Sequence, residues 1–295
     1  MDLAGARLRG ALARPRTIAL VLGAAFLVIW AAYAFSFARV EALHARLPAP
    51  RFFSGIHSLW LHNRVGHASY LLGRRSPDGF WYYYPVVLAV KTPLGILGLL
   101  LLALWFRSRK AAIPLAYCAA ILLCACFGRV NIGVRLILPI YVGFAVAGGC
   151  VAASAQGRLA RATVAVLLAW VVISGALQHP DYLAYFNEIA ASRPERFLAD
   201  SDLDWGQDMQ RLGDFLAPAG VSHLTFSPFN RTYALAGHPF PAMTPSDSAQ
   251  PAPGWNAVSI TIWKVFGFPE WAGRIAPQKR IGRSILLWYF PEKPP

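Results

Sequence analysis

Residues 179–212 read HPDYLAYFNEIAASRPERFLADSDLDWGQDMQRL, and the chemistry of the chain changes at this stretch. Eight of the fourteen acidic residues lie in it or just after it, at positions 181, 188, 195, 200, 202, 204, 208 and 214. The first 180 residues hold only three acidic residues against eighteen lysines and arginines. The stretch therefore predicts a boundary between a transmembrane domain (residues 1–178) and a small extracytoplasmic α/β domain (residues 179–295).

Composition favours a polytopic, helical membrane protein. Of the 295 residues 56% are apolar and only 14% are charged, and the mean hydropathy is +0.43. Soluble domains average about 25% charged residues. The net charge of +14 lies in short clusters between apolar runs, which argues against nucleic acid and favours membrane lipids and lipid-linked phosphates as partners. All four cysteines lie inside apolar runs, so the sequence predicts neither a disulfide framework nor a zinc site.

Five apolar runs predict transmembrane helices, since about 20 residues cross a bilayer. They cover roughly residues 17–36, 80–106, 111–127, 136–153 and 163–178. The first run is longer than the apolar core of a signal peptide, so we expect it to remain uncleaved. Basic residues precede it and recur at 107–110 and 154–162, which places these segments inside a bacterial cytoplasmic membrane and the C-terminal domain outside.

The predicted outer loop, residues 37–79, contains apolar residues at helical spacing. These are Phe52, Phe53, Ile56, Leu59 and Trp60. They predict a helix at the membrane interface, and Pro48 and Pro50 would stop any helix before it.

The acidic motif, Asp200, Asp202, Asp204, Gln207 and Asp208, allows two interpretations. An extended backbone would place the first three carboxylates on one side, with a helix beginning after Gly206. A regular calcium loop is excluded, because Trp205 and Arg211 stand where the glycine and the last carboxylate are required. An irregular divalent-cation site stays open. The favoured alternative is structural, in which aspartates cap the turn and the following helix.

Four residues on the predicted outer side are candidate ligands of a donor phosphate: Lys91, Arg135, Asn131 and His67. A lysine inside an apolar span costs about 2.5–3.5 kcal/mol, so Lys91 should be paired, snorkelling or functional. Arginine grips phosphate with two N–H groups, although interfacial anchoring would equally explain Arg135. A lone histidine is more often structural. Replacing Lys91 or Arg135 is expected to weaken lipid binding without unfolding the protein.

Several motifs resemble the C-terminal part of bacterial family 39-like, phospholipid carrier-dependent glycosyltransferases of the GT-C class, which are related to protein mannosyltransferases. The motifs are GHASYLLG (66–73), WYYYPVVLAVKTPLGIL (81–97), NIGVRLILPIY (131–141), HPDYLAYFNE (179–188) and DSDLDWGQDMQRL (200–212). The resemblance covers nearly the whole chain in order, but Ala191 and Ser192 replace the family's glycine pair. It implies transfer of a sugar from a polyprenyl phosphate to an extracytoplasmic acceptor.

The resemblance also implies that the family's catalytic carboxylate lies in a first outer loop that has no counterpart here. Glu41 follows the first predicted span, and a carboxylate is the expected general base. Its surroundings, FSFARVEALHARLPAP, resemble the middle of the family's chain, which argues against it. Two hypotheses follow: a glycosyltransferase completed by a separate N-terminal chain, or a non-catalytic remnant or accessory subunit that binds lipid-linked sugar or a partner chain.

Overall fold

The computed structural model describes residues 15–106, 109–230 and 237–291, and the chain divides into two compact units, Met1–Val65 and Gly66–Pro295. The predicted boundary at 178/179 falls inside the second unit, because the segment after residue 178 packs against the helices before it. Arg7, Arg9 and Arg14, which contribute to the predicted topology, lie outside the described residues.

The first unit contains two helices and a hairpin. Its elements are α2 (Pro15–Ala32), β1 (Phe37–Val40), β2 (Ala45–Pro48) and α3 (Pro50–Val65). The strands pair antiparallel, and α3 covers the predicted interfacial helix and begins at Pro50, where the missing N–H costs nothing. Neither helix buries a residue within the described chain, as expected of surfaces that contact lipid.

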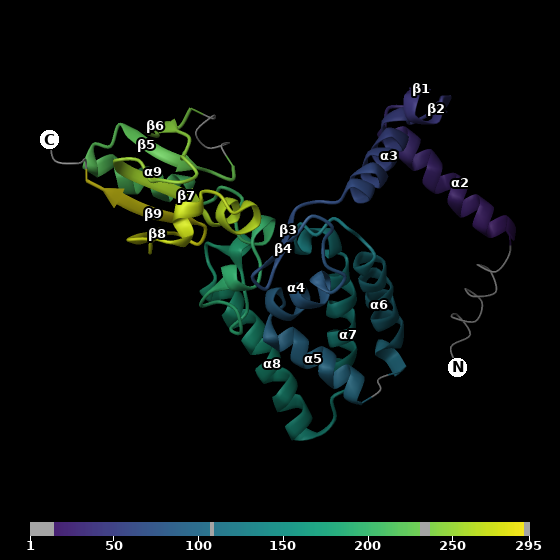
Figure 1. The fold of residues 1–295 in the computed structure, drawn as a ribbon. Coiled ribbons are helices and arrows are strands. Elements are labelled where there is room, and N and C mark those ends of the chain that lie inside the picture. Colours follow the sequence, from purple (N-terminus) through teal and green to yellow (C-terminus); the bar gives the residue numbers. More distant parts are fainter. Residues whose placement is uncertain (1–14, 107–108, 231–236, 292–295) are drawn as a thin grey trace. The chain divides into compact units, whose positions relative to one another are not determined.

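Helices dominate the first part of the second unit (Figure 1). They are α4 (Tyr83–Lys91), α5 (Leu94–Trp105), α6 (Ala112–Cys126), α7 (Ile140–Ser154) and α8 (Gly157–Leu177). Across the described residues of both units, three helical segments are long and apolar enough to cross a membrane: Pro15–Ala32, Arg109–Cys126 and Gly157–Leu177. The α4–α5 pair makes a fourth if it counts as one broken span. The five-span topology therefore stays a prediction.

The predicted span 80–106 is not one continuous helix. It breaks at Thr92–Pro93, and α4 and α5 meet at an angle of 115°. Proline lacks an N–H group and disfavours helical geometry in the residue before it, and Thr92 is extended accordingly (φ −91°, ψ 132°). The break leaves the carbonyl oxygens at the end of α4, next to Lys91, without donors from the same helix.

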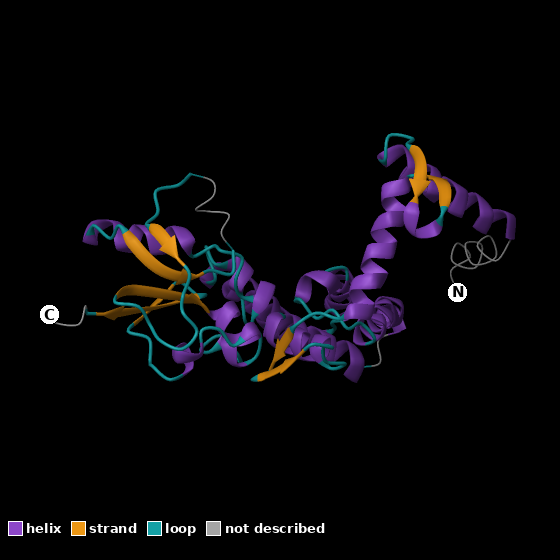
Figure 2. Ribbon diagram, turned by 45° about the horizontal axis from the view of Figure 1, so that its top comes forward, coloured by secondary structure: helices purple, strands orange, loops and turns teal. Residues whose placement is uncertain are grey.

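A five-stranded mixed sheet forms the C-terminal part (Figure 2). The helix α9 (Met209–Leu216) precedes strands in the order β6–β5–β7–β9–β8. Their bounds are β5 (His223–Ser227), β6 (Ala242–Thr244), β7 (Gly254–Ser259), β8 (Lys279–Ile281) and β9 (Ile285–Phe290). Strand β5 runs parallel to β6 and β7, whereas β9 runs antiparallel to β7 and β8. Strand β7 ends at Ser259, and the chain then turns into a π-helix, η8 (Ile262–Phe266).

Both faces of this sheet are buried. Along β9, Ile285 and Leu287 pack in one cluster with Met209 and Leu212 of α9. Leu286 and Trp288 point to the opposite face, where they join the core that includes residues of α4 to α7. The sheet domain and the helices thus share one continuous core, which fixes the acidic motif between them.

Candidate functional site

The acidic motif is a tight turn, as the favoured structural interpretation predicts, and not an extended segment with its first three carboxylates on one side. Asp200 to Asp202 form a 3-10 helix, and the amides of Leu203 and Asp204 donate to the Asp200 carbonyl at 2.9 Å. Asp200 has φ +61°, a left-handed conformation that aspartate tolerates better than most residues. The turn therefore sends the carboxylates of Asp200, Asp202 and Asp204 to three different sets of partners.

The second part of the motif stabilises the sheet domain from inside. Asp204 is buried, and its carboxylate accepts hydrogen bonds from the Ser259 hydroxyl (2.5 Å) and the Gly206 amide (2.8 Å). Gln207 accepts from the Trp205 amide at 2.7 Å and donates to the Leu203 carbonyl at 2.9 Å. These bonds close the turn on itself, as the structural interpretation predicts.

Asp208 joins the start of α9 to the connection between β8 and β9. Its Oδ2 accepts from the Arg283 amide (2.7 Å) and from the amide and hydroxyl of Ser284 (both 2.8 Å). Its Oδ1 accepts from Arg211, whose guanidinium also reaches Asp181 at 2.7 Å. The side chain is fully buried, so this network holds the domain together and leaves no oxygen for a ligand.

Asp202 and Lys91 connect the turn to the helices. The Lys91 ammonium donates to the carbonyl oxygens of Asp202 (2.7 Å) and Leu183 (3.1 Å). The Asp202 carboxylate accepts from the Tyr83 hydroxyl (3.1 Å) and the Val134 amide (2.9 Å). Burial raises the pKa of Asp202, while the positive charge of Lys91 and the Val134 amide act in the opposite direction. The structure thus shows Lys91 paired with backbone carbonyls, which is one of the three roles expected of a lysine in an apolar run.

Asn187, a residue that the sequence analysis did not single out, closes the break after α4. Its side-chain amide donates to the carbonyls of Ala89 (2.7 Å) and Thr92 (2.8 Å), and its backbone amide donates to Val90 (2.8 Å). These are the carbonyls that a helix end leaves without partners. The asparagine of HPDYLAYFNE and the proline of VKTP therefore belong to one structural feature, a link visible only in three dimensions.

Asn131 is also internal. It is buried, and its side-chain oxygen accepts from the Phe80 amide at 2.5 Å. Its backbone carbonyl accepts from the Ser69 hydroxyl at 3.3 Å. These contacts hold the 128–134 loop against the strand β3 (Ser69–Leu71). Asn131 and Lys91, two of the four predicted phosphate ligands, are thus committed to internal contacts.

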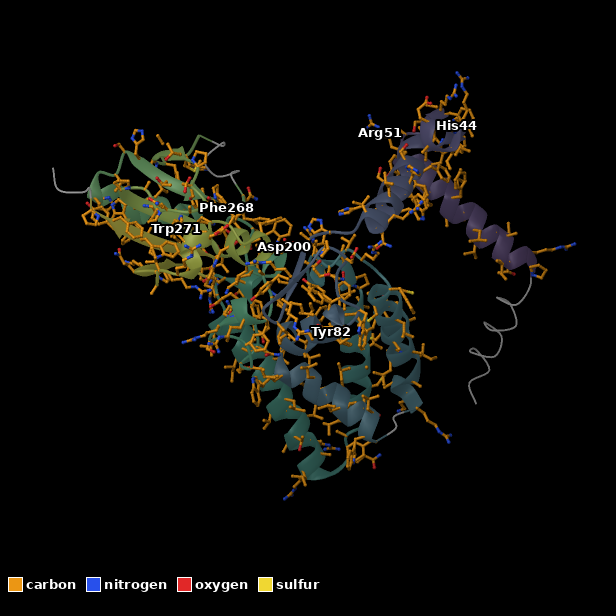
Figure 3. All side chains as sticks on the ribbon, viewed as in Figure 1. His44, Arg51, Tyr82, Asp200, Phe268 and Trp271 are labelled. Carbon is orange, nitrogen blue, oxygen red and sulfur yellow. The ribbon has the colours of Figure 1, made fainter. Side chains whose placement is uncertain are left out.

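The other two predicted ligands, His67 and Arg135, both interact with Asp200, which Figure 3 labels. The Asp200 carboxylate lies 3.9 Å from Nε2 of His67, and the side chains of Asp200 and His67 are 13% and 36% exposed, respectively. Arg135 is exposed, interacts electrostatically with Asp200, and holds its guanidinium 4.7 Å from the centre of the Trp205 ring. Trp205 donates from its indole to the Ser201 carbonyl at 2.7 Å, which fixes the ring. We call these four residues, His67, Arg135, Asp200 and Trp205, the turn edge.

Within the turn edge, the carboxyl group of Asp200 has an unusually high pKa. The pKa of Asp200 is raised from 3.8 to about 6, mainly by burial and to a smaller extent by the nearby charges of Asp202 and Asp204. The Ser201 amide, which donates to Asp200 at 2.6 Å, and the Arg135 guanidinium oppose the rise. A carboxyl with a pKa near neutrality exchanges protons readily at physiological pH.

No family model, no curated protein and no solved structure matches this chain. The resemblance to family 39-like glycosyltransferases therefore stays a prediction. The chemistry that the turn edge can support follows from its own four residues. Within the described residues, no group of three or more His, Cys, Asp or Glu side chains could hold a metal ion. Glu41 belongs to the first unit, where it is 82% exposed and lies 3.6 Å from Arg39.

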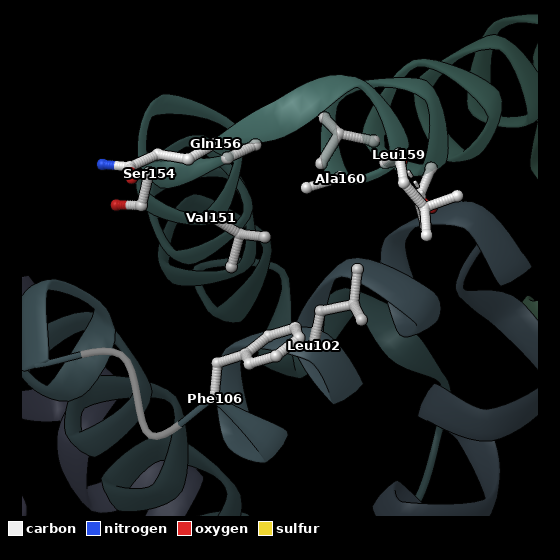
Figure 4. A pocket seen from close by; sticks show the side chains of 10 residues that line it. Leu102, Phe106, Val151, Ser154, Gln156, Leu159 and Ala160 are labelled. Atoms are coloured by element: carbon white, nitrogen blue, oxygen red, sulfur yellow. Dashed lines mark hydrogen bonds between the residues drawn. The ribbon is translucent and has the colours of Figure 1, made fainter.

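A cavity of about 420 Å³ lies between the C-terminal ends of α5 and α7 and the N-terminal part of α8 (Figure 4). Leu102, Phe106, Val151 and Leu159 contribute apolar side chains, and Ser154 and Gln156 stand at its edge. None of the predicted site residues lines it. A mainly apolar cavity of this kind has no polar constellation that would direct a reaction.

Proposed function

We propose that this protein is a membrane glycosyltransferase-like protein that binds a polyprenyl-phosphate-linked sugar at the turn edge. The observation that carries the proposal is the convergence of a cation, an aromatic ring and an acid–base pair at one accessible place. A guanidinium stacked on an indole is held in orientation while its N–H groups remain available to phosphate oxygens. The partly exposed Trp205 offers an apolar face beside it for a sugar ring.

In the proposed reaction Asp200, with His67 beside it, accepts the proton of the acceptor hydroxyl. The hydroxyl oxygen bonds to the anomeric carbon while the bond from that carbon to the phosphate oxygen breaks. The polyprenyl phosphate leaves with the bonding electrons, and Arg135 stabilises its charge. A base with a pKa near neutrality suits this step, because it is largely ionised at pH 7 and still accepts a proton.

Lipid binding tests the proposal directly. Undecaprenyl phosphate should raise the melting temperature of the detergent-solubilised parent protein, and Arg135→Gln should lose most of this increase. Arg129→Gln is the matched control, because Arg129 lies on the same connection but pairs with Asp78. Equal stabilisation of the Arg135→Gln variant and the parent would exclude Arg135 as the phosphate ligand.

The accessory-subunit hypothesis has its own support in the fastening roles of Lys91, Asp202, Asp204 and Asp208. A motif used mainly to hold a fold together needs no substrate. If undecaprenyl phosphate fails to stabilise even the parent protein, this second function becomes the better account.

Localisation follows from the same proposal. The alternating basic segments favour an N-terminus in the cytoplasm and a C-terminal domain outside a bacterial inner membrane. Alkaline phosphatase fused after Pro295 should therefore be active, and green fluorescent protein fused there should be dark. The opposite pair of results would overturn the predicted topology.

A further inference from the structure

A cluster of cations gathers where three distant segments of the second unit meet. The strand β4 (Arg74–Ser76) follows β3, which lies beside the segment after η5 (Pro194–Arg196) through a bridge between Leu71 and Leu198. The π-helix η8 lies against the same hairpin, because the Arg75 guanidinium donates to two of its carbonyls. These contacts bring Arg75, Arg196 and Lys264 into one electrostatically coupled group, hereafter the cation cluster.

Arg75 is held rigidly in this cluster. Its Nε donates to the Lys264 carbonyl at 2.6 Å, and one terminal nitrogen donates to the Trp263 carbonyl at 3.0 Å. Gly267 has φ +74°, and a Cβ added there would lie 2.7 Å from the other terminal nitrogen of Arg75. Only glycine permits this close approach, so the guanidinium is oriented before any ligand arrives.

Lys264 is the partly buried member of the cluster, and its charge has no direct counterion in the described part of the chain. Its ammonium lies 3.8 Å from the centre of the Trp263 ring and is only partly exposed. Among the residues that the structure describes, it donates no hydrogen bond and forms no ion pair. Burial lowers the pKa of Lys264, Glu195 opposes this, and the positive charges of Arg75 and Arg196 lower it further. A half-buried ammonium beside like charges is stabilised by any anion that reaches it.

The surrounding residues do not neutralise the cluster. Glu195 is the acidic residue that faces Lys264, and it forms an ion pair with Arg280 at 3.1 Å. Arg75, Arg196, Lys264 and Arg280 carry four positive charges against the one negative charge of Glu195, which leaves a net charge of +3. The Lys264 ammonium, the Arg196 guanidinium and the remaining N–H groups of Arg75 are donors of the kind that bind the oxygens of a phosphate group.

We propose that Arg75, Arg196 and Lys264 form a phosphate-binding site, separate from the turn edge. The ligand chemistry is a phosphate mono- or diester, supplied either by an anionic lipid head group or by a soluble phosphorylated molecule. The cluster lies in the part of the chain predicted to face the outer surface of the cytoplasmic membrane, where lipid phosphates are abundant. Phosphate binding at this site does not depend on the proposed sugar transfer at the turn edge.

Titrations of the full-length protein in neutral detergent test the site. The probes are inorganic phosphate and mixed micelles that contain dioctanoyl phosphatidylglycerol or dioctanoyl phosphatidylcholine. Lys264→Met should weaken phosphate or phosphatidylglycerol binding about tenfold, because a charged partner is lost. Lys279→Met is the matched control, since Lys279 also lies over an aromatic ring, 3.9 Å from Phe215, and should bind as the parent does.

The pattern of results identifies the source of the phosphate. Binding of phosphatidylglycerol alone assigns the site to lipid head groups, and binding of inorganic phosphate assigns it to a soluble phosphate group. Equal losses in the two lysine variants, or no binding by the parent, would overturn the site. The two sites are tested with different variants, Lys264→Met here and Arg135→Gln at the turn edge, so failure of this site is distinguishable from failure of the proposed donor site.

Discussion

The two halves of the acidic motif contain the same residue type but face different parts of the second unit, and among the four aspartates only Asp200 is not fully buried. Asp204 and Asp208 are buried in the sheet domain, where hydroxyl and amide donors satisfy them. Asp200 and Asp202 turn toward the helices, and Asp200 remains accessible with a raised pKa. A carboxylate surrounded by donors stabilises a fold, whereas a partly buried carboxylate with few donors is available for chemistry.

The largest effect should come from the satisfied half. Asp208→Ala leaves the Arg283 and Ser284 amides and the Ser284 hydroxyl without their acceptor, whereas Arg211 keeps its ion pair with Asp181. We expect the free energy of unfolding to fall by about 3–5 kcal/mol, because three donors lose their partner at a cost of about 1–3 kcal/mol each. Asp214→Ala, on the exposed face of the same helix, is the control for thermal unfolding. Equal melting temperatures for both variants would show that the network contributes little.

Lys91→Met tests the connection between the halves and the helices. It removes the donor to the carbonyls of Asp202 and Leu183 and one positive charge near Asp202. We expect a loss of about 2–3 kcal/mol, which differs from the sequence-based prediction that the protein would keep its stability. Lys110→Met, at an exposed position, should change little. If Lys91→Met instead abolishes lipid stabilisation at an unchanged melting temperature, the phosphate role predicted from sequence is restored.

Asp200→Asn should increase stability, and only near neutral pH. Because the folded-state pKa of Asp200, about 6, exceeds its usual 3.8, the folded protein binds this proton more tightly than the unfolded chain. The contribution of protonated Asp200 to the free energy of unfolding is therefore fully present below about pH 4 and is lost as the pH rises through 6. Asparagine tolerates the same positive φ, so the variant should exceed the parent by about 2 kcal/mol at pH 7 and match it near pH 4.

His67, Arg135, Asp202 and Asp204 all face Asp200, so the comparison must be made between variant and parent at each pH. A constant difference in melting temperature from pH 4 to pH 7 would contradict the raised pKa. Loss of sugar transfer in the more stable variant would support the proposed base.

Tyr83→Phe should have the smallest effect. It removes one hydrogen bond to the Asp202 carboxylate at 3.1 Å and leaves the Val134 amide and Lys91 in place. We expect a loss of about 1 kcal/mol, measured by thermal unfolding. A loss as large as that of Lys91→Met would mean that the hydroxyl, and not the ammonium, holds the turn to α4.

Residue order alone determined the coarse architecture. Long apolar runs predicted helices, and the rise in acidic residues after His179 predicted a separate sheet-containing part, because composition and periodicity are local properties. Pro50 and Trp60 similarly indicated the helix α3. Periodicity did not predict the sharp break at Pro93, although proline in a helix is a recognised signal, because a continuous apolar run concealed it.

Only the tertiary structure decided what each polar residue does. The alternation of aspartates suggested one acidic face, but hydrogen bonds within the turn direct Asp200, Asp202 and Asp204 to three different partners. Lys91 looked like a phosphate ligand because a charge in an apolar run is costly, yet the compensating carbonyls come from residues about a hundred positions later. The partners of a buried charge are set by packing between distant segments, which sequence spacing does not encode.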